Sequence, residues 1–198
     1  MRDAIVAIGN AVKPHLARLE AGDKVLVAVS GGADSLALAS AILKESEEFA
    51  ITPIAVTIDH QLQSGSGAQA EKVEKQLKEM GYGKVICKKV VVTTESGLEA
   101  GARDARYQAL STCVSEEKAT KVFLGHTRDD QAETVLLGLA RGSGTRSLSG
   151  MAIENGIYLR PLLHITRDET IAACKEIGVE PWNDPHNGNT EFSRVRVR

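Results

Sequence analysis

The segment of residues 24–35 carries the residues of this chain best suited to binding an anion. The apolar run Val25–Val29 leads directly into Ser30–Ser35, which reads Ser-Gly-Gly-Ala-Asp-Ser. Glycines have no Cβ, so they can adopt positive φ and turn successive N–H groups toward one anion, while the serines add hydroxyl donors. A helix that begins here points its unpaired N–H groups and positive dipole end at the same anion. The segment therefore predicts a loop that grips pyrophosphate.

This loop differs from a Walker A sequence, which needs Lys-Ser or Lys-Thr after its last glycine. Ala33, Asp34 and Ser35 stand there instead. A carboxylate beside a polyphosphate is repulsive unless a cation lies between them, and Mg²⁺ characteristically joins one or two carboxylates to substrate phosphates. Asp34 therefore predicts bound Mg²⁺. The alternative is a tight turn in which Asp34 or Ser35 only caps the following helix.

A second acidic group follows a predicted strand that ends at Gly125 and His126, with a helix expected to start near Asp130. Asp130 and Glu133 have capping-box spacing, which is a sufficient structural reason for both acids. The group also follows a strand end of the same predicted sheet, so Asp130 can face Asp34 across the phosphate site. Two carboxylates that converge on a triphosphate require a metal, which makes this pair the expected Mg²⁺ ligands.

The segment 98–108 predicts a helix with Arg103, Arg106 and Tyr107 on one face. A guanidinium matches phosphate oxygens with two hydrogen bonds and stays charged at any relevant pH, so Arg106 is the preferred phosphate contact. The alternative is an exposed, salt-bridged face, because Glu99 and Arg103 have the spacing of an i,i+4 ion pair.

The second predicted strand ends at Ile58 and Asp59, next to the phosphate loop. Residues just beyond a strand's carboxyl end are well placed to hold a nucleobase or ribose, and a backbone contact from Ile58 to adenine needs no special side chain. Asp59 has two open interpretations, as a nucleoside ligand or as the cap of the next helix.

Short β-branched runs alternate with helical patterns along the chain, which favours an α/β fold. We expect a Rossmann-like open sheet of five parallel strands, with helices on both faces and right-handed crossovers. The predicted strands are Lys24–Val29, Ile51–Ile58, Lys84–Val92, Lys121–Leu124 and Gly156–Leu159. In such a sheet the candidate residues gather at the carboxyl edge.

Composition agrees with one domain of 198 residues, of which 42% are hydrophobic and 25% charged. A net charge of −2 excludes a strongly basic nucleic-acid grip, so any RNA contact must be local. Charged residues interrupt Met1–Glu20, which predicts a soluble amphipathic helix, and no apolar run is long enough to span a bilayer. We expect no membrane partner.

Three widely separated cysteines, Cys87, Cys113 and Cys174, form no Cys-x-x-Cys pair, which favours a reducing cytoplasmic compartment. The alternating basic segment Ser193–Arg198 stops abruptly, so residues 190–198 are interpreted as the start of a basic linker in a larger protein.

Several stretches together resemble one family, the tRNA(Ile)-lysidine synthetases of the PP-loop ATP pyrophosphatase superfamily. They match its catalytic domain in order and spacing over almost the whole chain. The stretches are Ser30–Ser35, Asp59–Leu62, Ala102–Tyr107, Gly125–Thr134, Gly142–Gly144, Arg160–Leu163 and Trp182–Asn187. One departure is Val195, where many relatives have asparagine between two arginines.

The resemblance implies ATP and Mg²⁺ as cofactors, with L-lysine and the CAU-anticodon isoleucine tRNA as substrates. It implies adenylation of the wobble cytidine, then attack by the lysine ε-amine to give lysidine, AMP and pyrophosphate. The expected catalytic residues are Asp34, Asp130, Arg106, His126 and Glu133. The expected nucleotide-binding residues are Ser30, Gly31, Gly32, Ala33, Asp34, Ser35, Ile58 and Gly125. The group that takes the lysine proton stays open among His126, Asp130 and Glu133.

Three alternatives share the phosphate loop or the fold. A tRNA cytidine thiolase would deliver sulfur, and such relatives usually carry Cys-x-x-Cys pairs. An amide-forming ligase of the GMP or NAD synthetase kind would form AMP without RNA. A non-enzymatic ATP-binding regulator would release no pyrophosphate.

Overall fold

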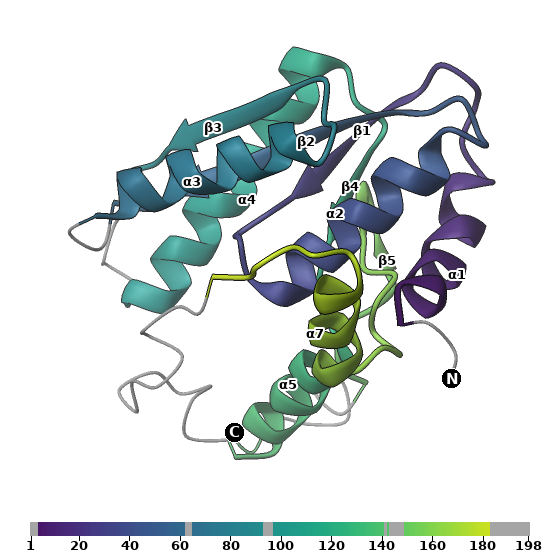
Figure 1. Ribbon diagram of the computed structural model, residues 1–198. Helices are drawn as coiled ribbons and strands as arrows, with labels where there is room; N and C mark the ends of the chain where they lie inside the picture. The colour runs from purple at the N-terminus through teal and green to yellow at the C-terminus, as the bar shows by residue number, and fades with distance from the viewer. Residues whose placement is uncertain (1–3, 62–64, 93–96, 141, 143–148, 183–198) are drawn as a thin grey trace.

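A single mixed sheet with the strand order β3-β2-β1-β4-β6-β5 organises the chain (Figure 1). The computed structural model describes residues 4–61, 65–92, 97–140, 142 and 149–182. All neighbouring strands are parallel except the last pair, β6 and β5. The strands are β1 (Lys24–Ala28), β2 (Thr52–Asp59), β3 (Val85–Lys89), β4 (Lys121–Leu124), β5 (Glu154–Asn155) and β6 (Tyr158–Leu159).

The predicted α/β class is confirmed, but the count of five strands is wrong. The described residues form six strands because the expected fifth strand is the second arm of a hairpin. Gly156 has a φ of +61° at the first of the two turn residues between β5 and β6, a conformation that glycine adopts without strain. The third strand is also shorter than its β-branched run predicts and ends at Lys89.

Helices cover both faces of the sheet, as predicted (Figure 1). They are α1 (Ala4–Leu16), α2 (Ala33–Ser46), α3 (Ser66–Glu79), α4 (Leu98–Glu117), α5 (Arg128–Ala140) and α7 (Arg167–Glu176). The first of them confirms the helix expected near the N-terminus. No helix among the described residues is long and apolar enough to cross a membrane.

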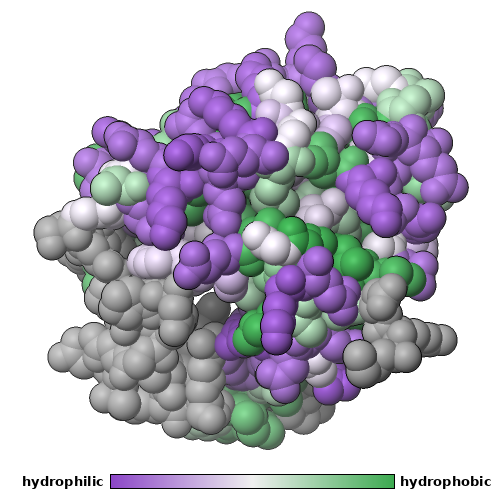
Figure 2. Space-filling view, in the orientation of Figure 1, coloured by the Kyte–Doolittle hydropathy of each residue, from purple (hydrophilic) through white to green (hydrophobic). Residues whose placement is uncertain are grey.

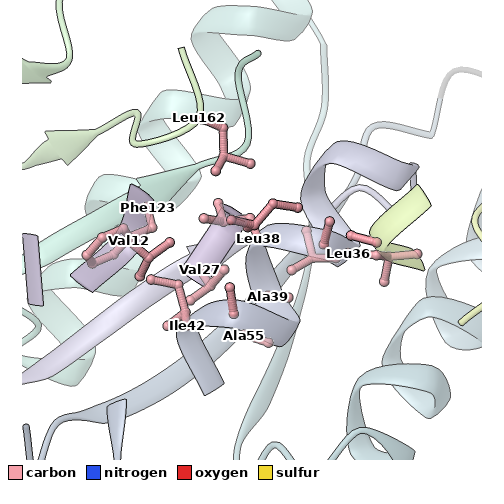
Figure 3. Packing of buried hydrophobic residues seen from close by; sticks show 14 of the residues in the cluster. Val12, Val27, Leu36, Leu38, Ala39, Ile42, Ala55, Phe123 and Leu162 are labelled. Atoms are coloured by element: carbon pink, nitrogen blue, oxygen red, sulfur yellow. The ribbon is translucent and has the colours of Figure 1, made fainter. Parts of the chain in front are cut away.

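Successive side chains of β1 point to opposite faces of the sheet and pack into two separate hydrophobic cores. Val25 and Val27 pack with α1, α2, α3 and α7 on one face, whereas Leu26 packs with α4 on the other. Figure 3 shows Val27 in the first of these cores, together with Val12 of α1 and Leu38 of α2. Burial of apolar side chains on both faces explains why β1 reads as a continuous apolar run. This central strand is therefore a rigid base for the loop that follows it.

The carboxyl ends of β1, β2 and β4 meet at one edge, because these strands are parallel neighbours. Helices α2 and α5 begin directly after β1 and β4 at this edge. Figure 2 shows that polar side chains cover much of the surface seen in the same orientation, with apolar side chains exposed between them. The predicted basic linker at 190–198 lies outside the described residues, as does most of the stretch Trp182–Asn187.

Candidate active site

The predicted phosphate loop joins β1 to α2 through one glycine in a left-handed conformation. Gly31 has a φ of +89°, whereas Gly32 is extended at φ −75° and ψ 162°. Gly32 occupies the N-cap position of α2 and makes no side-chain cap hydrogen bond. The alternative in which Asp34 or Ser35 caps α2 is therefore wrong. Ala33 and Asp34 instead begin the helix, where backbone N–H groups have no intrahelical partner.

The hydroxyl of Ser35 holds this loop together from inside. It accepts a hydrogen bond from the Ser30 N–H at 3.2 Å and donates to the Gly32 carbonyl at 2.9 Å. Its Oγ also lies 3.2 Å from Oγ of Ser30. Ser35 is buried, and these hydrogen bonds fix the curvature of the loop.

Two glycines allow close packing around the loop. A Cβ on Gly31 would lie 2.6 Å from Cγ2 of Val73 on α3. A Cβ on Gly125 would lie 3.0 Å from the carbonyl oxygen of Asp34. Gly125 thus lets the connection between β4 and α5 approach the start of α2. This close approach brings the two acidic groups predicted from the sequence to the same place.

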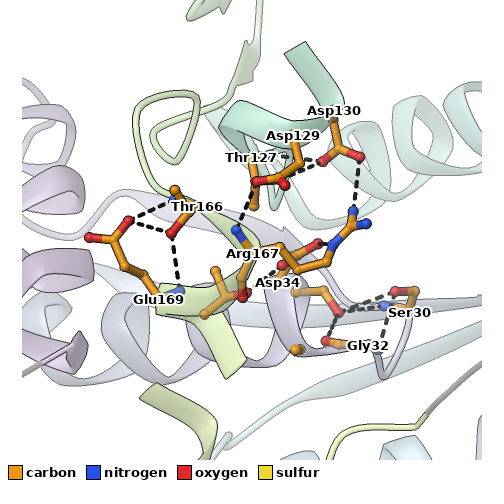
Figure 4. A network of polar contacts seen from close by, with 12 residues as sticks. Ser30, Gly32, Asp34, Thr127, Asp129, Asp130, Thr166, Arg167 and Glu169 are labelled. Carbon is orange, nitrogen blue, oxygen red and sulfur yellow. Dashed lines mark hydrogen bonds and ion pairs between the residues drawn. The ribbon is translucent and has the colours of Figure 1, made fainter. Parts of the chain in front are cut away.

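Asp34 and Asp130 are joined by a guanidinium that the sequence analysis did not single out (Figure 4). Nε of Arg167 lies 3.2 Å from Oδ2 of Asp34, and its Nη2 lies 3.3 Å from Oδ1 of Asp130. Burial is the largest influence on Asp34 and raises the pKa of its carboxyl group. A hydrogen bond from Thr170 and the charge of Arg167 oppose that shift, while the charge of Asp130 adds to it.

Asp130 caps its helix in a different way from the one predicted. Helix α5 begins at Arg128, so Thr127 precedes the helix and Asp130 is its third residue. Oδ2 of Asp130 accepts the Thr127 N–H at 2.8 Å and the Thr127 hydroxyl at 3.1 Å. The predicted capping pair of Asp130 and Glu133 is wrong because the helix starts two residues earlier than expected. Glu133 is buried within α5.

The first turn of α7 forms hydrogen bonds with the acidic residues at the starts of both α2 and α5. Thr166 and Glu169 form a reciprocal capping box that fixes the start of this helix (Figure 4). From that turn, the Arg167 N–H donates to Oδ2 of Asp129 at 2.9 Å, and the Thr170 hydroxyl donates to Oδ1 of Asp34. The starts of α2, α5 and α7 therefore meet around the carboxylates.

A positively charged cluster beyond Asp130 consists of Arg103 and Arg106 on α4 and Arg160 after β6, and its charges act on His126 of the β4–α5 connection. Burial and the nearby charge of Arg106 lower the pKa of His126 to about 3, with Arg160 and Arg103 contributing less. Nδ1 of His126 is buried without a hydrogen-bond partner in the described part of the chain. The His126 imidazole is therefore neutral near pH 7.

Arg160, which is buried, holds the centre of this cluster. It donates to the Tyr107 hydroxyl at 3.2 Å and to the Ala152 carbonyl at 3.0 Å. Burial alone would raise the pKa of Tyr107, but the Arg160 hydrogen bond and three arginine charges together lower it. Arg106 has its guanidinium carbon 5.8 Å from the centre of the Tyr107 ring. The cluster favours an anion on this side of the site.

Strand β2 ends at Asp59, one residue beyond the predicted end at Ile58. Asp59 is buried, and its Oδ1 accepts the Gln61 N–H at 2.9 Å. Helix α3 begins only at Ser66 after Gly65. The interpretation of Asp59 as a helix cap is therefore wrong, because its carboxylate stabilises a turn.

A family model described as the PP-loop domain matches residues 6–198. The chain belongs to the PP-loop family. Two curated relatives, each named tRNA(Ile)-lysidine synthase, come from Thermobifida fusca (strain YX) and Streptomyces coelicolor. They are 48% identical over 98% of this chain and 51% identical over 88% of it, respectively. The chain spans 60% and 50% of the lengths of these two relatives.

A solved structure has the same fold. The U34-tRNA thiolase NcsA from Methanococcus maripaludis, solved with its [4Fe-4S] cluster, superimposes with a TM-score of 0.78 at 20% identity. The match covers 98% of this chain and 71% of the thiolase. At this identity the likeness supports the fold alone.

The donor set of this PP-loop site fits Mg²⁺. In the described ranges, no group of three or more His, Cys, Asp or Glu side chains converges. Asp34 and Asp130, which share Arg167 as a partner, are the carboxylates of this site. Mg²⁺ is typically held by one or two carboxylates together with substrate phosphates and water. Arg167 already occupies the space between these carboxylates, which indicates that a cation is favoured there.

Sequence reasoning missed α7 as part of this PP-loop site, although two signals were present. Thr166 and Glu169 have the spacing of a capping box. Arg167 directly follows the cap, where the positive end of the helix dipole disfavours a cation. Because Arg167 gains no stabilisation from the dipole of its own helix, an acidic partner elsewhere in the fold is expected.

Proposed function

We propose that this chain is the catalytic domain of a tRNA(Ile)-lysidine synthase. It would adenylate the C2 oxygen of the wobble cytidine in isoleucine tRNA with a CAU anticodon, and then form lysidine with L-lysine. The observation that carries the proposal is identity of 48% to a relative of that name across 98% of this chain. The convergence of Asp34 and Asp130 beside a phosphate loop supports the proposed chemistry.

In the first proposed step, the cytidine C2 oxygen attacks the α-phosphorus of ATP. A new P–O bond forms, the bond between the α-phosphorus and the bridging oxygen breaks, and pyrophosphate leaves. Ser30–Ser35 would hold the β and γ phosphates with backbone N–H groups at the start of α2. Arg106 would offset negative charge near the α-phosphate.

The metal assignment in this proposal rests on the carboxylate pair. Asp34 and Asp130 would hold Mg²⁺, which when bound neutralises phosphate charge in the transition state. Ile58 and Gly125 lie on the carboxyl side of β2 and β4, where the nucleoside would be expected.

In the second proposed step, the neutral ε-amine of lysine attacks C2 of the cytidine. A C–N bond forms, the C–O bond to the adenylate breaks, and AMP leaves with the electron pair. The amine must also lose a proton. A pKa of about 3 makes His126 a poor acceptor. Asp130 would hold Mg²⁺, so Glu133, which is buried on the same helix, is the proposed acceptor. The neutral His126 could still donate a hydrogen bond.

The alternatives receive less support. The three cysteines are free thiols on three separate elements, Cys87 on β3, Cys113 on α4 and Cys174 on α7. They form none of the Cys-x-x-Cys pairs expected of a thiolase. The names of the curated relatives favour lysidine synthesis over an amide-forming ligase or a regulator. We propose cytoplasm as the compartment, where thiols remain reduced, and propose residues 1–198 as one catalytic domain.

The position of ATP cleavage tests the proposed chemistry. The full-length protein would be incubated with ATP, Mg²⁺, lysine and the tRNA transcript, and nucleotide products would be separated by chromatography. We expect AMP and pyrophosphate in equal amounts, formed only when the tRNA is present. ADP and orthophosphate as primary products would contradict the proposal, and AMP formation without RNA would favour the amide-forming ligase.

A further inference from the structure

Arg167 takes the position of a cation between two carboxylates from different parts of the fold. Its side chain is 27% exposed, and those of Asp34 and Asp130 are 19% and 15% exposed. The three groups are thus largely removed from solvent, where charges interact more strongly than at the surface. Their summed charge is −1, because one guanidinium faces two carboxylates.

The local structure holds Arg167 where its own helix disfavours it. It follows Thr166 at the start of α7, so its charge lies near the positive end of the helix dipole. The capping box of Thr166 and Glu169 and the bond from Thr170 to Asp34 fix this turn. Burial alone would lower the pKa of Arg167, but the carboxylates of Asp34 and Asp130 raise it. The guanidinium therefore acts as a permanent positive charge in the site.

We propose that Arg167 is an internal counter-ion that competes with the divalent cation for Asp34 and Asp130. The inference rests on the proposed function, which assigns these carboxylates to Mg²⁺. While Arg167 is paired with both carboxylates, their negative charge is partly neutralised, so a divalent cation without nucleotide binds them less tightly. Nucleotide phosphates add negative charge that can receive the cation and the guanidinium together. Arg167 thereby makes cation binding dependent on nucleotide.

A titration with Mn²⁺, followed by the electron paramagnetic resonance signal of the free ion, tests this competition. The full-length protein would be measured without nucleotide as wild type and as Arg167→Gln. We expect the glutamine variant to bind Mn²⁺ at least about tenfold more tightly, because a positive charge within a few ångströms has been removed. Equal Mn²⁺ affinity in the two proteins would overturn the proposal.

Three further variants separate competition from a general change in charge. Arg128 is an exposed arginine that is the first residue of α5, as Arg167 is the first residue of α7. Arg128→Gln should bind Mn²⁺ like wild type. Arg167→Lys keeps the charge and should remain within about threefold of wild type. Asp34→Asn combined with Arg167→Gln should lose the gain, because one carboxylate of the pair is gone. A gain that persisted in this double variant would place the Mn²⁺ elsewhere and overturn the proposal.

A second readout covers the case in which Arg167→Gln folds poorly. Two neighbouring carboxylates that have lost their shared guanidinium would then destabilise the protein, and Mn²⁺ should restore the circular dichroism of the folded state. A variant that stays unfolded in millimolar Mn²⁺ would contradict the competition. Binding of Mn²⁺ with a non-hydrolysable ATP analogue to wild type, Asp34→Asn and Asp130→Asn tests the metal assignment separately. Loss of binding in the asparagine variants keeps that assignment even if Arg167→Gln shows no gain.

Discussion

Nε of Arg167 lies 3.2 Å from Oδ2 of Asp34, although 133 positions separate the two residues in the chain. This contact joins the start of α7 to the end of the phosphate loop. It opposes the effect of burial, which raises the pKa of Asp34. The charge balance of the site therefore depends on α7, which is distant in sequence from the motifs that predicted the site.

Replacing Arg167 by glutamine should destabilise the protein in a pH-dependent way. In the folded state the pKa of Asp34 lies above its unfolded value of 3.8. Protonated Asp34 therefore adds to the free energy of unfolding below that unfolded value, and this contribution is lost as pH rises through the folded-state pKa. Without the guanidinium this pKa rises further. We expect a small loss near about pH 4 and a loss of about 1 to 3 kcal/mol near about pH 8. Urea unfolding across pH measures it, and an equal loss at both ends would contradict the account.

Alanine at Gly31 should cost more stability than alanine at Gly22, a matched control. Both glycines have a positive φ, +92° at Gly22 and +89° at Gly31. A Cβ on Gly22 would meet no atom within 4 Å, whereas one on Gly31 would lie 2.6 Å from Val73. We expect about 1 to 2 kcal/mol for the positive φ at both positions, and about 1 to 3 kcal/mol more at Gly31. Thermal unfolding of the two variants provides the comparison, and equal losses would show that α3 does not support the loop.

Asparagine and alanine at Asp130 separate helix capping from chemistry. An asparagine oxygen can still accept the Thr127 N–H, and loss of the charge also relieves repulsion with Asp34. We expect Asp130→Asn to keep near-native stability, while Asp130→Ala loses about 1 kcal/mol because the Thr127 N–H and hydroxyl lose their acceptor. Lysidine formation by Asp130→Asn in single turnover should fall at least about a hundredfold, because the metal ligand loses its charge. Near-normal turnover would leave Asp130 with a structural role alone.

Residues 1–198 should bind the isoleucine tRNA weakly. The net charge of −2 allows few phosphates to be neutralised, so the affinity should fall steeply as salt rises, while ATP binding persists. Filter binding at several salt concentrations measures this dependence. Tight binding that resists salt would place the RNA contact surface within these residues.

Local sequence signals were sufficient for the parallel sheet and for the loop after β1. Alternating helical and β-branched runs fix the order of elements, and Ser30–Ser35 has a composition typical of an anion-binding turn. The prediction that Asp34 and Asp130 face one another followed from parallel strand ends, and the structure brings them to a common partner.

Other features depended on geometry that local patterns do not encode. The β5–β6 hairpin was missed because each of its strands has only two residues. The capping role of Asp130 was misassigned because Thr127, rather than Asp130, precedes α5. Arg167 was missed because its partners come from two distant helices, and only the folded chain brings them together.

Transfer of lysine into tRNA tests the central claim most directly. The full-length protein would be incubated with radiolabelled lysine, ATP, Mg²⁺ and an isoleucine tRNA transcript with a CAU anticodon, and label in RNA would be counted. We predict one label per tRNA with one AMP released, and none when the anticodon cytidine is replaced or when Asp34 is changed to asparagine. A fully folded protein that leaves the RNA unlabelled would contradict the account.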